Sequence, residues 1–167
     1  DRGAGPRPDA QDEVSPERAQ VAGARRRGRW DGGRLLVSAG GANDPENTPG
    51  VASLLSLLLD QGTTTRTAEE IADTIDSIGG IIAVGAGVDL SFASIIVMKD
   101  SFELALELLS DIARNPAYSP SEINRQRQQL MSGIQVSYED PEYLADIAFG
   151  KLVYGLHPYG RPQNGTS

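Results

Sequence analysis

The residues that could perform chemistry in this chain are few. The sequence contains one histidine, His157, and no cysteine. Between Gly50 and Arg66 a strongly apolar helix is predicted to end at a Gly-Thr step, and Ser53 and Ser56 lie one helical turn apart in it. Hydroxyls with an imidazole can serve nucleophilic hydrolysis, whereas a catalytic zinc centre takes three protein ligands, usually with histidine among them. A conventional zinc site therefore cannot be built from this chain alone.

His157 is also a poor candidate for the base of a Ser-His-Asp hydrolase, because it stands in the turn-like segment GLHPYGRP. We predict a loop histidine that stacks on or bonds to a neighbour such as Tyr159. The sequence has neither a G-x-G-x-x-G nor a G-x-x-x-x-G-K pattern, so nothing supports a phosphate-binding loop. We therefore assign no catalytic and no cofactor-binding residue.

Composition and charge limit the class of protein. The chain has 167 residues, of which 39% are apolar, enough for one domain with a core. Residues 1–34 hold eight Arg and six acidic residues, whereas the rest holds seven basic and seventeen acidic residues. An acidic body repels phosphate backbones, so nucleic acid is not an expected partner despite the basic run at 25–29. The longest apolar run, Val51 to Leu59, is too short for a membrane helix.

The first 33 residues differ in composition from the rest of the chain. They are rich in Gly, Pro and Arg, have few large apolar residues and show no periodicity. Such a composition cannot support a core, so we predict a disordered or non-native segment over 1–33. A linker, a vector remnant and a wrongly joined reading frame are all consistent with it. Ordered structure is expected to begin at Arg34, and residues 34–167 form the predicted domain.

The hydrophobic periodicity predicts an α+β fold. A strand at 34–40 and a helix beginning at Gly50 are followed by further segments whose type is set by apolar spacing. These are a helix at 67–80, an antiparallel hairpin at 81–98, and helices at 100–116, 119–140 and 141–155. Antiparallel strands with several helices favour a two-layer sandwich, a mostly antiparallel sheet with helices covering one face.

The helix starts carry recognisable signals. Three pairs have the spacing of a capping box, in which two side chains satisfy each other's backbone amides. A fourth helix has an Asp-Pro step at its start. The three pairs are Thr67 with Glu70, Asp100 with Glu103, and Ser119 with Glu122, and the step is Asp140-Pro141.

Several segments then match one known family in order. They are GANDPENTPGVASLLSLLLDQGTTTR, EIADTIDSIGG, RQRQQL and YGLHPYGRPQNGT. Over roughly residues 34–167 the chain resembles the N-terminal domain of the pitrilysin/insulinase family of zinc metallopeptidases, which includes the mitochondrial processing peptidases. The resemblance implies the fold of those peptidases, incomplete at the C-terminus.

The resemblance also implies that the metal site is degenerate. Active members carry an H-x-x-E-H motif on the helix before the Gly-Thr step. Alignment on Gly62-Thr63 places the two His positions at Ser53 and Leu57, and the Glu position at Ser56. A downstream Glu ligand falls at or next to Gly133. Ser hydroxyls are poor zinc ligands and Leu is none, so we predict no metal here and interpret the serines as small groups that face a neighbour.

Family members often work as two homologous halves, one of which binds zinc. The resemblance therefore favours a non-catalytic subunit or fragment that shares a peptide substrate with a zinc-bearing homologous partner. An Arg and a Tyr that assist catalysis would lie in a second domain outside this chain, and the location would be periplasmic or otherwise exported if the source is bacterial. The alternative is a structural or assembly protein that uses the same fold without a role in proteolysis. A partner with an intact H-x-x-E-H motif would distinguish the two hypotheses.

Overall fold

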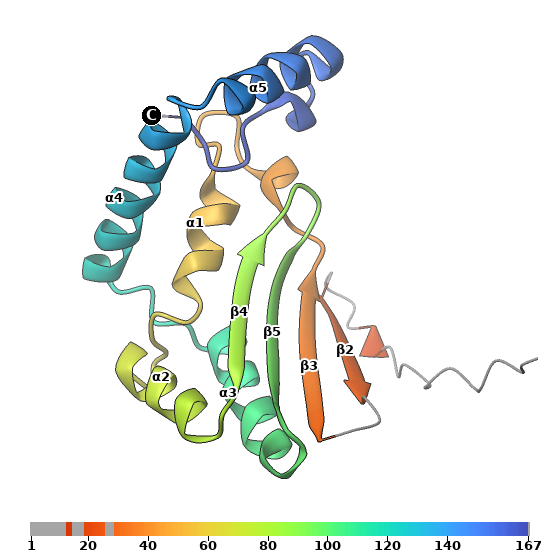
Figure 1. Ribbon diagram of the computed structural model, residues 1–167, viewed down its shortest axis with the longest axis vertical. Coiled ribbons are helices and arrows are strands. Elements are labelled where there is room, and N and C mark those ends of the chain that lie inside the picture. The colour runs from red at the N-terminus through yellow and green to blue at the C-terminus, as the bar shows by residue number, and fades with distance from the viewer. Residues whose placement is uncertain (1–12, 15–18, 26–28, 167) are drawn as a thin grey trace, which may run out of the picture.

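The computed structural model describes residues 13–14, 19–25 and 29–166. Strands come first, then helices and a hairpin, then three helices in succession (Figure 1). The strands are β1 (Glu13–Val14), β2 (Ala19–Arg25), β3 (Trp30–Val37), β4 (Ile81–Ala86) and β5 (Ser91–Met98). The helices are α1 (Val51–Leu58), α2 (Ala68–Ser77), α3 (Phe102–Arg114), α4 (Pro120–Ser137) and α5 (Pro141–Tyr154). Short 3-10 turns are η1 (Gly41–Asn43), η2 (Lys99–Ser101) and η3 (Pro158–Gly160).

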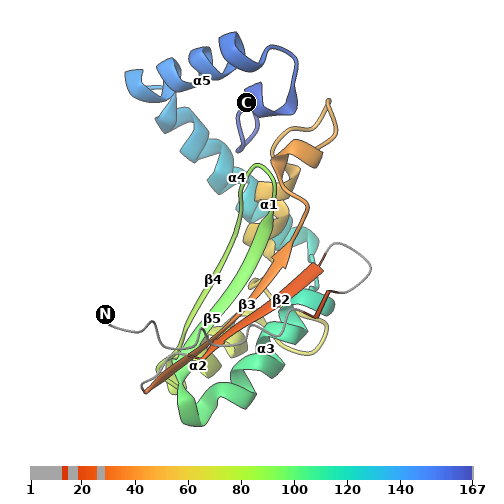
Figure 2. The ribbon, with the colours of Figure 1, turned by 90° about the vertical axis from the view of Figure 1, so that its right-hand side faces the viewer.

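The strands form one antiparallel sheet in the order β1-β2-β3-β5-β4. The long strands β3 and β5 pair from Trp30 opposite Met98 to Val37 opposite Ser91. Helices α2 and α3 lie against one face of this sheet (Figure 2). The predicted two-layer α+β sandwich with a mostly antiparallel sheet is therefore confirmed.

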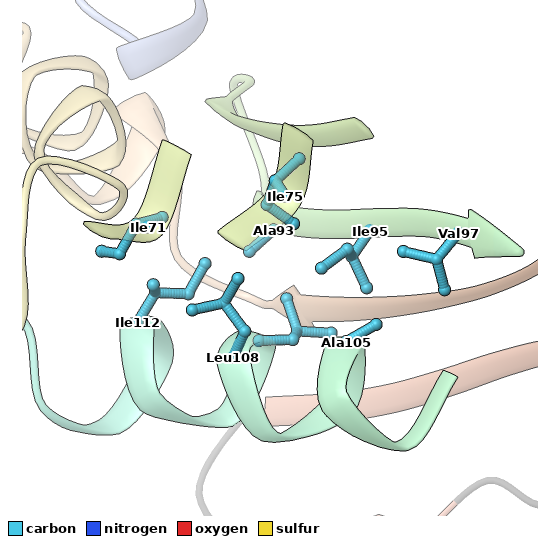
Figure 3. Close-up of a cluster of buried hydrophobic side chains, with 9 residues drawn as sticks. Ile71, Ile75, Ala93, Ile95, Val97, Ala105, Leu108 and Ile112 are labelled. Atoms are coloured by element: carbon cyan, nitrogen blue, oxygen red, sulfur yellow. The ribbon is translucent and has the colours of Figure 1, made fainter. Parts of the chain in front are cut away.

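The core lies between the sheet and these two helices (Figure 3). Strand β5 alternates between its faces, so that Ala93, Ile95 and Val97 point inward and are at most 1% exposed. The helices contribute residues at helical spacing: Ile71 and Ile75 from α2, and Ala105, Leu108, Leu109 and Ile112 from α3. Burial of these side chains provides the main driving force for folding.

The start of the ordered region differs from the prediction. Strand β3 begins at Trp30, four residues before Arg34, and β2 pairs with β3 along its whole length. Residues 19–25 and 30–33 lie in strands despite their poor composition, because backbone pairing with a long neighbouring strand outweighs it. Residues 1–12, 15–18 and 26–28 lie outside the described part of the chain. A domain boundary at residue 34 stays a prediction.

The predicted capping signals have different outcomes. Thr67 and Glu70 form the complete box that begins α2, and Asp140 Oδ1 accepts from the Glu142 amide at the start of α5. The box at Asp100 and Glu103 is wrong, because η2 precedes α3 and moves the N-cap to Ser101, whose side chain makes no capping bond.

Only half of the predicted box on α4 forms. Ser119 Oγ accepts from the Glu122 amide, but the Glu122 carboxylate accepts from Arg125 Nε at 2.8 Å.

Helix α5 packs differently from the others. Not one of its residues is buried, and Phe149, Leu152 and Val153 are 66%, 85% and 55% exposed. It lies at the far end of the molecule from α2 and α3 (Figure 1). In the described part of the chain no helix is long and apolar enough to cross a membrane.

Candidate functional site

Helix α1 lies between α4 and the edge strand β4 (Figure 1). It begins at Gly50, which has a φ of 94° and serves as the N-cap without a side chain. Asp44 supplies the missing cap from six residues earlier. Its carboxylate accepts from the Gly50 amide at 2.7 Å and from the Ala52 amide at 2.9 Å. These bonds satisfy two amide groups at the helix start and fix its position.

The hydroxyls of Ser53 and Ser56 both donate to backbone carbonyls. Ser53 Oγ donates to the Gln163 carbonyl at 2.9 Å, and Ser56 Oγ donates to the Ser53 carbonyl at 2.8 Å. The two residues are 8% and 4% exposed. Ser53 therefore faces the segment that follows α5, whereas the Ser56 hydroxyl bonds within its own helix.

On α4, burial differs among Gly133, the predicted fourth degenerate position, and its neighbours Ser132 and Ile134. Gly133 is exposed, and a Cβ built there would meet nothing within 4 Å. The adjacent Ile134 is 4% exposed and belongs to the side of α4 that is buried. The geometry therefore favours Ile134, next to Gly133, as the residue directed into the protein.

These residues do not fit a zinc ion. The two hydroxyls already serve backbone acceptors, and the Leu57 and Ile134 side chains offer no lone pair. Within the described ranges, no group of three or more His, Cys, Asp and Glu side chains is placed to hold a metal.

His157 takes the role predicted for it. Its Nδ1 accepts from the Tyr159 amide at 3.3 Å, and its ring meets that of Tyr159 edge-on at 4.8 Å. The residue is exposed and caps η3, at the start of the turn that leads to Gln163. It acts as a structural residue of this turn.

A second polar centre, which sequence reasoning missed, lies around Asp111. One carboxylate oxygen accepts from Thr63 at 2.8 Å, Thr65 at 2.9 Å and Arg66 at 2.8 Å. The other oxygen accepts from Asn115 at 3.0 Å. A surface cleft of about 540 Å³ lies beside it, lined by Thr65, Arg66, Glu107, Ser110, Asp111 and Asn115.

These bonds control the ionisation of Asp111. The Asn115 amide, together with Thr63, Arg66 and Thr65, holds the pKa of the carboxyl well below its usual range, although burial opposes this. Asp111 stays ionised and ties the loop before α2 to the end of α3. In the sequence, the only sign of this centre is that Asp111, an acidic residue, lies beside the apolar residues Leu108 and Ile112 of α3.

Comparison with known proteins connects this geometry to a family. The family described as insulinase (peptidase family M16) matches residues 33–166. The chain belongs to the insulinase family. Its relatives include an uncharacterized zinc protease of Rickettsia felis, 30% identical over 133 residues, which cover 80% of this chain and 32% of that protein. An uncharacterized zinc protease of Mycobacterium leprae is 30% identical over 79% of this chain and 30% of that protein.

Two solved structures share the fold of this chain. A peptidase M16 inactive domain from Pseudomonas fluorescens superposes with a TM-score of 0.83 at 28% identity, over 94% of this chain and 39% of that chain. A protease from Helicobacter pylori gives a TM-score of 0.85 at 19% identity, over 95% of this chain and 39% of that chain. This insulinase-family chain thus spans about a third of the length of the curated relatives it matches.

Proposed function

We propose that this chain forms part of a non-catalytic half of a zinc metallopeptidase, which supports peptide processing by a homologous zinc-bearing half. One observation carries the proposal. The residues aligned with the ligands and base of H-x-x-E-H are two hydroxyls bonded to backbone carbonyls and one leucine, on a helix that the fold otherwise retains. In an active site the histidines would bind the metal and the glutamate would activate water.

The inactive M16 domain of Pseudomonas fluorescens supports the proposal, since that domain combines this fold with inactivity and is 28% identical to the chain. A pairing of two unlike halves would form a heterodimer. For a bacterial source the proposal extends to an exported or periplasmic location, which fractionation of the source cells would test.

The edge of the sheet beside α1 offers a place for a peptide substrate. Strand β4 is the last strand of the sheet, so one of its backbone edges is unpaired within the described residues. The strand reads IIAVGA and contains no charged residue and no proline, the features that usually block strand addition. An extended peptide bound along this edge would be held by backbone hydrogen bonds. A half without zinc could hold a substrate in this way.

The alternative is a structural or assembly protein with no role in proteolysis. Both hypotheses require the same fold and the same degenerate site. They differ in whether the chain supports proteolysis or the assembly of another complex. The alternative requires no zinc-bearing partner and no peptide binding. Only a functional measurement distinguishes them.

The decisive experiment captures the partner and measures its activity. Tagged chain is used to isolate binding proteins from the source cells, which are then identified by mass spectrometry. The proposal expects a homologue with an intact H-x-x-E-H motif, whose chelator-sensitive cleavage of a fluorogenic peptide rises when the chain is added. A captured homologue whose cleavage rate does not change would support the assembly role.

The isolated chain gives a simpler test. After dialysis against zinc and then against buffer, metal analysis should find far less than one zinc per chain, and the chain should not cleave peptides. About one retained zinc with chelator-sensitive cleavage would contradict the proposal. An intact H-x-x-E-H relative treated in the same way is the positive control.

A further inference from the structure

The segment after α5 folds back over the start of α1. Residues 158–165, which we call the clasp, lie beside η1 and α1 although they are about a hundred residues away in sequence (Figure 1). The clasp carbonyl at Gln163 accepts from Ser53 Oγ at 2.9 Å. It therefore covers the first of the degenerate ligand positions.

The end of the clasp is fitted closely to the start of α1. Gly165 is buried at a φ of 87°, and a Cβ there would lie 2.5 Å from the Pro49 carbonyl oxygen. Gly50 makes the same kind of contact from the other side, since a Cβ added there would lie 2.7 Å from the Asn164 carbonyl oxygen. Two glycines in the left-handed region thus allow the two backbones to touch. A side chain at either position would separate them.

Two residues of the clasp attach it to other loops at this end. Tyr159 Oη donates to Asp89 Oδ1 at 2.6 Å, in the turn between β4 and β5. Arg161 donates to the Asp44 carbonyl at 3.5 Å and pairs with Glu46 at 3.3 Å. The clasp therefore joins the cap of α1 to the turn that ends the edge strand β4.

The clasp is held by polar contacts and has little apolar anchorage. Gly165 is its only buried residue, whereas Tyr159, Gln163 and Asn164 are exposed. The Arg161–Glu46 pair is weak, because the Glu46 side chain is 86% exposed. Segments with few buried apolar contacts open at a lower free energy than the whole domain.

We propose that the clasp is a conformational gate, which opens without unfolding the domain, exposes the Ser53 face of α1 and releases the β4–β5 turn. The closed state hides Ser53 and orders the end of the β4 edge. The open state makes the Ser53 face accessible to an extended peptide and frees the turn beside the β4 edge. The interpretation of Ser53 as a former ligand position rests on the proposed function, but the gate rests on these contacts alone.

Thiol labelling tests the gate directly, because the chain has no cysteine. A Ser53→Cys variant should react with a thiol reagent at least about tenfold more slowly than a Ser132→Cys variant, whose thiol lies on the exposed side of α4. Adding Gly165→Ala should raise the labelling rate of the Ser53→Cys variant at least about tenfold and leave that of the Ser132→Cys variant unchanged. Hydrogen exchange at residues 86–90 should also rise when Gly165→Ala is present.

A matched glycine separates local opening from general destabilisation. Gly79 also has a positive φ, of 60°, but a Cβ there meets nothing within 4 Å. It follows α2, which lies at the opposite end of the molecule from the clasp (Figure 1). Gly79→Ala should therefore leave the labelling rate of the Ser53→Cys variant unchanged. Tyr159→Phe removes one hydrogen bond of the clasp and should raise the labelling rate of the Ser53→Cys variant about two- to tenfold. This milder variant tests the gate if Gly165→Ala does not fold.

Two results would overturn the gate. The first is labelling of the Ser53→Cys variant as fast as that of the Ser132→Cys variant when the clasp is unaltered, since the clasp would then not cover Ser53. The second is an equal acceleration by Gly79→Ala and Gly165→Ala, since opening would then be global unfolding. Neither result bears on zinc binding or on the zinc-bearing partner, so failure of the gate is distinguishable from failure of the proposed function.

Discussion

The two ends of this molecule are stabilised in different ways. Around α2, α3 and β5, apolar side chains such as Ile95 and Ile112 are completely buried. Around α5 and the clasp, apolar side chains such as Leu152 and Leu156 are 85% and 97% exposed, and the contacts are hydrogen bonds, an ion pair and edge-on packing of exposed aromatic rings. Apolar burial concentrates stability at the first end. The second end, which includes Ser53, has few buried apolar side chains, and we expect it to open at a lower free energy.

The largest expected effect compares one apolar side chain from each end. Ile95→Ala should lower the free energy of unfolding by about 2–5 kcal/mol, because a cavity is left in a packed core. Leu152→Ala should change it by no more than about 0.5 kcal/mol, since that side chain is exposed. Urea denaturation at neutral pH measures both. Equal losses would show that α5 is packed as tightly as β5.

The second prediction concerns the buried charge at the packed end. Asp111→Asn should cost about 1–3 kcal/mol at pH 7, because the donors around it lose a charged acceptor. The matched change Glu107→Gln should cost less, because the Glu107 side chain is 63% exposed where it pairs with Arg66. Equal costs would contradict a special role for the buried carboxylate.

The pH dependence of this difference has a defined sign. Since the Asp111 pKa is lowered on folding, its contribution is complete above the unfolded pKa of about 3.9 and is lost as the pH falls toward the folded pKa. The gap between the parent and Asp111→Asn should be constant from about pH 8 to 5 and shrink below about pH 4. Denaturation curves over this range test it. A gap that closes near pH 6 would contradict the assignment.

The third prediction tests the degenerate site at the second end. Ser53→His, Ser56→Glu and Leu57→His are combined either with Ile134→Glu or with Gly133→Glu. The Ile134 version should bind zinc at least about tenfold more tightly, because only that side chain is directed into the protein. Calorimetry on variants shown to be folded by circular dichroism measures this. Tighter binding by the Gly133 version would place the lost ligand at Gly133.

The smallest expected effect is a gain in stability. Gly133→Ala should stabilise by about 1 kcal/mol, because alanine favours a helix and the added Cβ meets nothing within 4 Å. Gly80→Ala is the contrasting control at the packed end, where a Cβ would lie 2.8 Å from Val97 Cγ1 and should destabilise. Thermal unfolding of both variants provides the comparison. Destabilisation by Gly133→Ala would show a close neighbour on this side of α4.

Most of the element order was predictable because its signals are local. The box of Thr67 and Glu70 lies within one helical turn, and the apolar residues of α2 recur at helical spacing. The false box at Asp100 has the same spacing, but the chain forms the 3-10 turn η2 first. Residues 19–25 had the composition of a disordered tail, and pairing with β3 places them in the sheet. Local patterns failed where a neighbouring element decided the outcome.

The sequence by itself determined the α+β class, the family resemblance and the absence of His and Cys ligands from α1, since these depend on residue types and on spacings within a few turns. Only the tertiary structure decided that Asp44 caps α1, that Ser53 bonds to Gln163, and that Ile134 rather than Gly133 is buried. The physical reason is separation along the chain. Ser53 and Gln163 are 110 residues apart. Their hydrogen bond exists only because the packing of intervening helices returns the chain to the start of α1.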